Sequence, residues 1–139
     1  MPQTNGAHWR LRILAAALLL CRARFLVAAV KFGTWRNTLG TPGADREQSR
    51  PDKEEAKRQA ARIERAAQLL PFQIKCLPRA MALSWVLRDR MIRHSVVFAV
   101  RPAQFRGSLD DLHAWVEVDG EKVLGDLPGS WAELHRIGE

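Results

Sequence analysis

The chain has 139 residues, of which 47% are hydrophobic and 27% charged. This length fits one domain, and this balance excludes an intrinsically disordered chain. The two cysteines, Cys21 and Cys76, are too few for a disulfide framework, and the sequence has no Cys-x-x-Cys or Cys/His cluster that would predict a zinc site. We therefore expect one compact domain in a reducing cytoplasm.

The excess positive charge lies in the first half of the chain. Residues 1–65 hold 13 Lys and Arg against 6 Asp and Glu, whereas residues 66–139 hold 9 of each. A basic half joined to a neutral half favours an acidic partner, which charge alone does not identify as nucleic acid, membrane or polypeptide. Nucleic acid is the weakest of these options, because no predicted helix has a one-sided basic face with interleaved aromatic residues.

An apolar run of nine residues, from Ile13 to Cys21, follows two arginines as in a secretory signal peptide. The run is less than half of the roughly 20 residues that a membrane-spanning helix needs. Arg22 and Arg24 follow it at once, and the basic residues spread around a helical wheel, which argues against an in-plane membrane anchor. We predict helix over residues 8–32, broken near Cys21, with this cysteine as a small buried hydrophobe.

A turn-rich stretch over residues 40–43 precedes a second predicted helix, from Ser49 to about residue 70. A capping serine, an early proline and acidic residues mark its start. Its small apolar residues recur at spacings of four and three, which predicts a narrow buried stripe of Ala56, Ala60, Ile63, Ala67 and Leu70. Glu54 and Arg58 have the i,i+4 spacing of an exposed ion pair.

A third helix is predicted from Cys76 to about Ile92, with Pro78 in its first turn. The residues expected to face the core recur at intervals of three and four: Leu77, Ala80, Met81, Ser84, Leu87 and Met91. Trp85 is also expected in the core.

The remaining sequence predicts a small antiparallel sheet. Strands are expected over residues 95–100, 113–118 and 121–127, with a loop over 102–111 and a hairpin turn at Asp119-Gly120. Residues 130–133 have the form of a capping box and predict a short terminal helix. The predicted fold class is therefore α+β.

The hairpin turn predicts a register in which opposite charges and apolar side chains face one another. The expected pairs are Val118 with Glu121, Glu117 with Lys122, Val116 with Val123, Trp115 with Leu124, and His113 with Asp126. This register places an imidazole beside a carboxylate, which can fix the tautomer of the ring.

Cys76 supplies the nucleophile that such a pair lacks. A helix N-terminus favours the thiolate form of a cysteine, and its free N–H groups can hold the oxyanion of an acyl-transfer intermediate. Cys76, His113 and Asp126 thus form a candidate nucleophile, base and orienting acid, although a histidine beside an acid is more often structural.

Three segments carry a family resemblance: C-L-P-R-A-M-A-L from Cys76, the strand S-V-V-F-A-V-R, and D-L-H-A-W-V-E-V-D-G-E-K-V-L-G-D. Together they resemble the transglutaminase-like cysteine leader peptidases of lasso-peptide biosynthesis, strongly over about residues 70–128. The N-terminal half, including W-R-N-T-L-G from Trp35, is similar in character but less specific. The resemblance implies a papain/transglutaminase-like fold. We therefore expect a basic helical region, 1–70, packed on a catalytic module, 71–139, in one compact domain.

The resemblance also implies an activity, namely removal of the leader from a ribosomally made precursor before a separate ATP-dependent cyclase closes a macrolactam ring. The family's acid lies about a dozen residues beyond its histidine. This spacing matches Asp126, whereas Asp119 falls in the turn. The chemistry needs no metal or organic cofactor. A small leader-binding protein is the expected partner, because the chain has no room for a recognition domain, and the basic half is its candidate docking surface.

Other polar and aromatic residues have two interpretations each. Gln73 is either an oxyanion donor, as in papain-like sites, or a surface glutamine. Arg79 either holds substrate or forms a salt bridge, and Trp115 is either core or a wall of the cleft. The remaining residues have no chemical pattern: His8, His94 and His135 are expected at the surface, and Asp110 and Asp111 as loop acids that could contact substrate.

Two other classes of function stay open. A transglutaminase-like acyltransferase would use the same triad with an amine in place of water. A non-enzymatic basic adaptor would bind a membrane or nucleic acid through its helices, with a merely structural hairpin. Exchange of Cys76 for alanine separates the last class, since an adaptor would keep its activity.

Overall fold

The computed structural model describes residues 4–39, 50–102, 112–126 and 130–138. The helical part comprises α1 (Thr4–Ala29), α2 (Phe32–Trp35), the short 3-10 helix η1 (Arg36–Thr38), α3 (Arg50–Leu69) and α4 (Cys76–Asp89). The strands that follow are β1 (Ser95–Val100), β2 (Leu112–Val118), β3 (Glu121–Leu124) and β4 (Ala132–Gly138). They form one antiparallel sheet in the order β3-β2-β1-β4, which confirms the predicted α+β class.

Several predicted features lie outside the described residues. They are the turn at 40–43, the capping Ser49, most of the loop with Asp110 and Asp111, and residue 127. The predicted strand over 121–127 is too long, because β3 ends at Leu124 and the described residues 125 and 126 are not in a strand.

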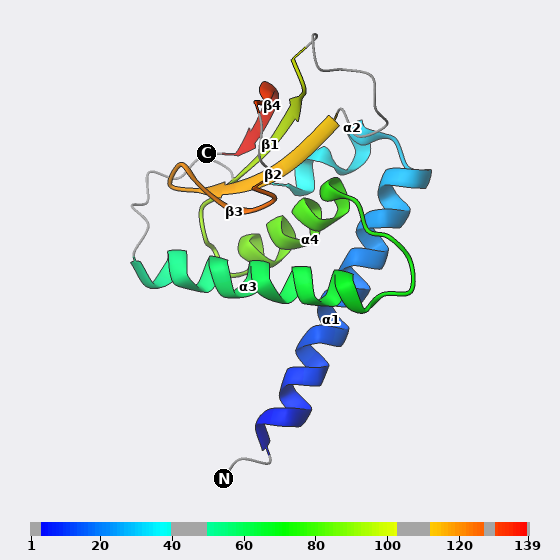
Figure 1. The fold of residues 1–139 in the computed structure, drawn as a ribbon, viewed down its shortest axis with the longest axis vertical. Coiled ribbons are helices and arrows are strands. Elements are labelled where there is room, and N and C mark those ends of the chain that lie inside the picture. Colours follow the sequence, from blue (N-terminus) through cyan, green and yellow to red (C-terminus); the bar gives the residue numbers. More distant parts are fainter. Residues whose placement is uncertain (1–3, 40–49, 103–111, 127–129, 139) are drawn as a thin grey trace.

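Helix α4 lies between the sheet and the other two long helices, α1 and α3 (Figure 1). Successive side chains of a strand point to opposite faces, so alternate residues of β2 reach α4. Ala114, Val116 and Val118 belong to the main core with α4, whereas Trp115 packs with Val97 and Ala99 in a second cluster. This second cluster therefore lies on the face of the sheet away from α4.

The end of α4 corrects one prediction. The helix ends at Asp89, short of Ile92, in a pair of hydrogen bonds from Met91 N–H to the Arg88 carbonyl and from Ile92 N–H to the Leu87 carbonyl. These two bonds form a Schellman motif, whose central residue adopts a left-handed conformation. Met91 occupies that position with φ 58° and is 74% exposed, so the prediction of a core role for Met91 is wrong.

Helix α1 is continuous, and the predicted break near Cys21 is wrong. Its buried residues recur at spacings of three and four and pack toward α3 and α4: Ile13, Ala16, Leu20 and Ala23. Cys21 does not share this face, so its side chain is exposed, and its predicted burial is also wrong. No helix in the described part of the chain is long and apolar enough to cross a membrane.

Helix α3 confirms its predicted stripe. Four of the five residues are buried and Leu70 is half-buried. The predicted partner of Arg58 is wrong, because Arg58 Nε donates to Glu55 Oε2 at 2.9 Å in place of Glu54. The half-buried Glu55 carboxylate also accepts from Gln59 at 2.7 Å, and these bonds lower the pKa of its carboxyl group.

The predicted terminal helix is wrong, since residues 132–138 form strand β4, which pairs with β1. Without β4, the N–H and C=O groups along one edge of β1 would lack partners. The hydrogen bonds that β4 makes to these groups outweigh the local capping signal of residues 130–133. Strand β1 therefore lies inside the sheet, with β2 on its other side.

The hairpin begins as predicted and then departs from its register. Asp119 and Gly120 have φ angles of 52° and 75°, as a type I′ turn requires, and the pairs of Val118 with Glu121 and of Glu117 with Lys122 are confirmed. The register then shifts at a β-bulge, so that Val116 pairs with Leu124. The predicted pairs of Val116 with Val123, Trp115 with Leu124 and His113 with Asp126 are therefore wrong.

Candidate active site

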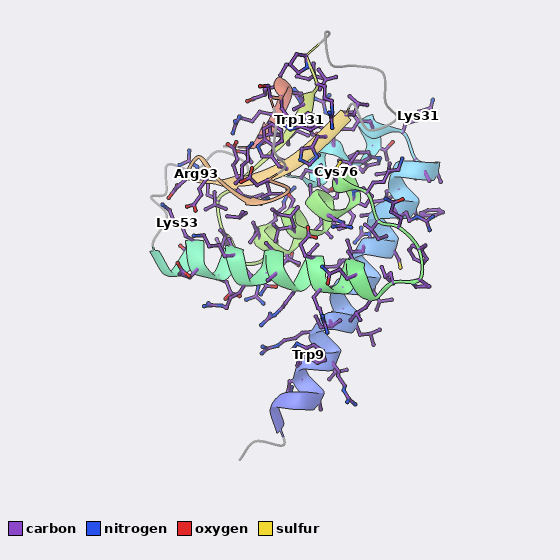
Figure 2. All side chains as sticks on the ribbon, in the orientation of Figure 1. Trp9, Lys31, Lys53, Cys76, Arg93 and Trp131 are labelled. Atoms are coloured by element: carbon purple, nitrogen blue, oxygen red, sulfur yellow. The ribbon has the colours of Figure 1, made fainter. Side chains whose placement is uncertain are left out.

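The Cys76 side chain is partly exposed at the first residue of α4. Its Sγ lies 4.0 Å from the carbonyl oxygen of Leu112, at the start of β2, and Figure 2 labels the residue at this end of the helix. The preceding N-cap residue, Lys75, is extended, and its side chain makes no capping hydrogen bond to the helix. The first N–H groups of α4 thus stay available to an anion near the sulfur.

His113 is buried on β2, and its Nε2 lies 2.5 Å from the carbonyl oxygen of Gly125. A carbonyl oxygen only accepts hydrogen bonds, so Nε2 carries the proton and the neutral ring keeps its acceptor lone pair on Nδ1. Burial lowers the pKa of the imidazole, and the positive charge of Lys122 lowers it further, whereas the hydrogen bond to Gly125 raises it. A neutral ring with a free Nδ1 is suited to act as a base.

Two indole rings surround this imidazole. The centroid of the His113 ring lies 5.7 Å from that of Trp115 and 5.0 Å from that of Trp131, at the start of β4. Trp115 thus contacts His113 as a wall residue would, while also belonging to a core cluster. Trp131 was missed by the sequence prediction, because its segment was assigned to a helix start rather than to a strand beside β1.

The segments that carry the three candidate triad residues are in contact, but the three side chains are not hydrogen-bonded to one another among the described residues. Cys76 contacts the residue before His113, and His113 contacts the residue before Asp126. Among the described residues, no hydrogen bond joins the thiol to the imidazole or the imidazole to the carboxylate. The Asp126 side chain is 76% exposed, with Lys122 Nζ at 3.9 Å. The Gly125 carbonyl therefore occupies the position expected of the orienting acid.

The imidazole lies with Trp115 and Trp131 on the face of the sheet away from α4. Cys76 belongs to α4, on the other face, and its sulfur lies near Leu112 at the same end of β2. Because the two groups lie on opposite faces of the sheet, direct transfer of a proton between them requires a rearrangement of this end of β2 and not a rotation of the ring alone. Catalytic hydrogen bonds are often long or absent before substrate binds. The catalytic roles of Cys76, His113 and Asp126 remain predictions.

The other candidate site residues have these surroundings. Arg79 donates through Nε to the Ile74 carbonyl at 2.9 Å and through Nη1 to Glu64 on α3 at 2.6 Å, so its guanidinium already has partners within the protein. Gln73 is exposed in the segment before α4. Trp85 is half-buried, and its indole Nε1 donates to Thr38 Oγ1 at 2.9 Å.

His94 is buried, and its predicted surface position is wrong. Its Nδ1 lies 2.8 Å from the Ile92 carbonyl and must donate to it, which leaves Nε2 to accept from the Ser84 hydroxyl at 2.7 Å. A serine and a histidine in this arrangement can form a nucleophile and base pair. Since both side chains are buried, substrate has no access to them, and the pair is structural.

The buried histidines predict a pH dependence of stability. Burial lowers the pKa of His94, and the nearby Arg88 lowers it as well, whereas the hydrogen bond to Ile92 raises it. The unfolded chain binds the proton more readily, with a pKa of about 6.5, so stability is greatest above that pH. The free energy of unfolding should fall as the pH decreases below it, by at most about 1.4 kcal/mol per pH unit for this histidine.

Urea denaturation at a series of pH values measures this slope. The variant His94→Gln should have a shallower pH dependence, whatever its stability at neutral pH. His135→Gln, which changes an exposed histidine, should keep the slope of the unaltered chain. Equal slopes in all three proteins would contradict the assignment to His94.

A polar depression of about 390 Å³ lies at the other end of β2 from His113, lined by Arg93, Ser95, Glu117, Asp119, Gly120 and Arg136. Glu117 accepts from Trp115 Nε1 and from Arg136 Nη1, both at 2.8 Å. This network orients the Trp115 indole through its Nε1–H and lies at the opposite end of β2 from the Cys76 thiol. Within the described part of the chain, no three potential metal ligands of the His, Cys, Asp or Glu type are grouped.

The fold thus places a cysteine at the start of a helix that packs on an antiparallel sheet, with a histidine on the neighbouring strand. The chain belongs to the transglutaminase-like superfamily, whose sequence profile matches residues 14–139. This superfamily includes both cysteine peptidases and acyltransferases. No curated protein and no solved structure matches the chain.

Proposed function

We propose that the chain is a cysteine peptidase that removes the leader from a ribosomally made lasso-peptide precursor before macrolactam closure. One observation supports the peptidase chemistry above the others: the partly exposed Cys76 thiol lies at a helix N-terminus that the Lys75 side chain does not cap, and 4.0 Å from the strand that carries His113. The choice of a lasso precursor rests on the resemblance of residues 70–128.

In the proposed reaction, Cys76 Sγ attacks the scissile carbonyl carbon while His113 Nδ1 takes the thiol proton. The N–H groups at the start of α4 stabilise the oxyanion. His113 then protonates the leaving amine, and water releases the acyl group from sulfur. Asp126 is the proposed orienting acid, and the Gly125 carbonyl holds Nε2–H in the free protein. The mechanism uses no metal or organic cofactor.

The test combines the purified protein with a lasso precursor and its leader-binding protein, and identifies the products by mass spectrometry. We expect two peptides, leader and core, whose masses together exceed that of the precursor by one water. Omission of the leader-binding protein should slow the reaction, because we propose that this partner delivers the leader. Intact precursor after prolonged incubation would contradict the peptidase proposal.

An added primary amine distinguishes the other activity found in the superfamily. An acyltransferase would yield a leader that carries the amine, whereas a peptidase yields a free carboxylate. If the amine adduct forms in preference to the hydrolysis product, the reaction is acyl transfer, and the assignment of water as acceptor is wrong.

A further inference from the structure

Helix α1 is apolar on two opposite faces, of which only one is covered by the protein. The face opposite the buried stripe carries exposed apolar residues at spacings of three, four, three and four: Leu11, Leu14, Leu18, Cys21 and Phe25. The four large ones are 55–64% exposed. We call these five residues the α1 outer stripe. A helix that is apolar all round is normally buried on all sides, so this stripe predicts a further contact.

The spacing of the outer stripe indicates the kind of surface that covers it. Alternating steps of three and four residues give a narrow seam with a period of 3.5, which is the pattern of helix-to-helix packing in coiled coils. The N-terminal half of α1 also projects beyond α3 and α4, so this half of the seam is open (Figure 1). A second helix can therefore lie along this half without meeting α3 or α4.

The charges beside the stripe indicate the composition of that helix. Arg10 and Arg24 flank the stripe on one side and Arg22 on the other, and none of these three has an ion pair within the described residues. The Arg22 guanidinium lies 4.9 Å from the Trp85 ring centroid and that of Arg24 4.4 Å from the Phe72 centroid. The aromatic rings thus hold two cations beside the stripe, where acidic residues of a partner would meet them.

A second copy of the chain fits this surface poorly. It would bring its own arginines to the seam, and residues 1–44 contain no acidic residue to compensate them. Like charges across a helix interface oppose association. A membrane surface fits less well than a helix, because interfacial helices present one broad apolar face. The other large exposed apolar residues of α1, Trp9 and Val27, lie on the side of the helix opposite the outer stripe and do not widen it.

We infer that the α1 outer stripe binds an amphipathic helix of a partner polypeptide, with apolar residues along its seam and acidic residues on both flanks. This contact does not depend on the proposed peptidase activity. The leader-binding protein expected for that activity is one source of such a helix, but the surface defines the partner by its chemistry alone.

A designed probe tests the inference by binding rather than by cleavage. The probe is a fluorescent three-heptad peptide with Leu at its a and d positions and Glu at e and g, and the matched peptide has Lys in place of Glu. Fluorescence anisotropy with the full chain should give a Kd at least about tenfold lower for the Glu peptide, and added salt should raise that Kd.

The double variant Leu14→Glu/Leu18→Glu should raise this Kd at least about tenfold, because it places charge in the seam. Both leucines are exposed, so the variant should keep its circular dichroism spectrum and Tm. The control is Leu69→Glu, at the end of α3, which changes a 57% exposed leucine that does not belong to the stripe and adds the same kind of charge. It should bind the Glu peptide nearly as well as the unaltered chain.

Three results would overturn the inference. Equal Kd values for the two peptides, or no binding of either, would remove the role of the acidic flanks. Binding to phosphatidylglycerol vesicles in preference to the Glu peptide would assign the stripe to a membrane. A dimer in sedimentation equilibrium that Leu14→Glu/Leu18→Glu dissociates would assign it to a second copy.

Discussion

Exchange of Cys76 for alanine is expected to abolish precursor cleavage and to leave the fold intact. The sulfur is the only proposed nucleophile, and alanine can form no acyl-enzyme. The Cys76 thiol is partly exposed and makes one long approach, of 4.0 Å, to the Leu112 carbonyl, so the loss of stability should be small. Mass spectrometry of the precursor reaction and a thermal unfolding curve measure the two effects separately.

Cys21 provides a matched control within the same chain. It is exposed on α1 and is the other of the two cysteines, so Cys21→Ala should cleave the precursor at the rate of the unaltered protein. Cys21 also belongs to the α1 outer stripe, but alanine there is small and apolar and keeps the seam. If Cys76→Ala cleaves as fast as Cys21→Ala, the chain does not use this thiol, and the proposed function is wrong.

Gly125→Ala is expected to reduce both stability and activity. Gly125 has a φ of 87°, and a Cβ there would lie 3.0 Å from the Ala114 carbonyl oxygen and 3.0 Å from Trp115 Cβ. The backbone must shift to admit the methyl group, and left-handed backbone adds strain, at a combined cost of about 1–3 kcal/mol. The same shift moves the carbonyl that holds His113 Nε2–H, so the rate of cleavage should fall about tenfold or more.

Gly120→Ala is the control for Gly125→Ala, because it introduces the backbone strain without the steric contact. Its φ is 75°, and a Cβ there would meet nothing within 4 Å. Gly120→Ala should therefore cost only the left-handed strain of about 1–2 kcal/mol and should keep full activity in the folded protein. Urea denaturation and the precursor reaction measure both variants. If the two variants lose activity equally, the Gly125 carbonyl does not position His113.

The sequence predicts those parts of the fold that local signals determine. The α3 stripe, the start of α4 at Cys76 and the turn at Asp119-Gly120 depend on periodicity, a helix-start proline and left-handed backbone. Each of these signals lies within a few residues of the feature that it predicts.

The wrong predictions concern features that distant residues determine. Strand β4 replaces a predicted helix because β1 needs a partner on its second edge, and that need is absent from residues 130–133 themselves. His94 is buried because Ser84, on the preceding helix, supplies its hydrogen bond. Cys21 is exposed because an apolar helix has more apolar surface than α3 and α4 can cover.

The candidate site is predictable in its residues but not in its contacts. The helix start and the strand pattern predict that Cys76 and His113 belong to neighbouring elements, as they do. The β-bulge between Val116 and Glu117 has no local sequence signal, and it breaks the predicted pairing of His113 with Asp126. The Gly125 carbonyl and the Trp131 indole, which take its place around the imidazole, are contributed by backbone geometry and by an unexpected strand.

The sheet order also sets a sequence of events during synthesis of the chain. Strands β1, β2 and β3 are consecutive neighbours, so they can pair as soon as they leave the ribosome. The other edge of β1 must wait for residues 132–138, and the Trp131 ring reaches His113 only with this segment. The nascent protein thus exposes an unpaired strand edge until residues 132–138 have left the ribosome, and its imidazole gains the Trp131 ring only afterwards.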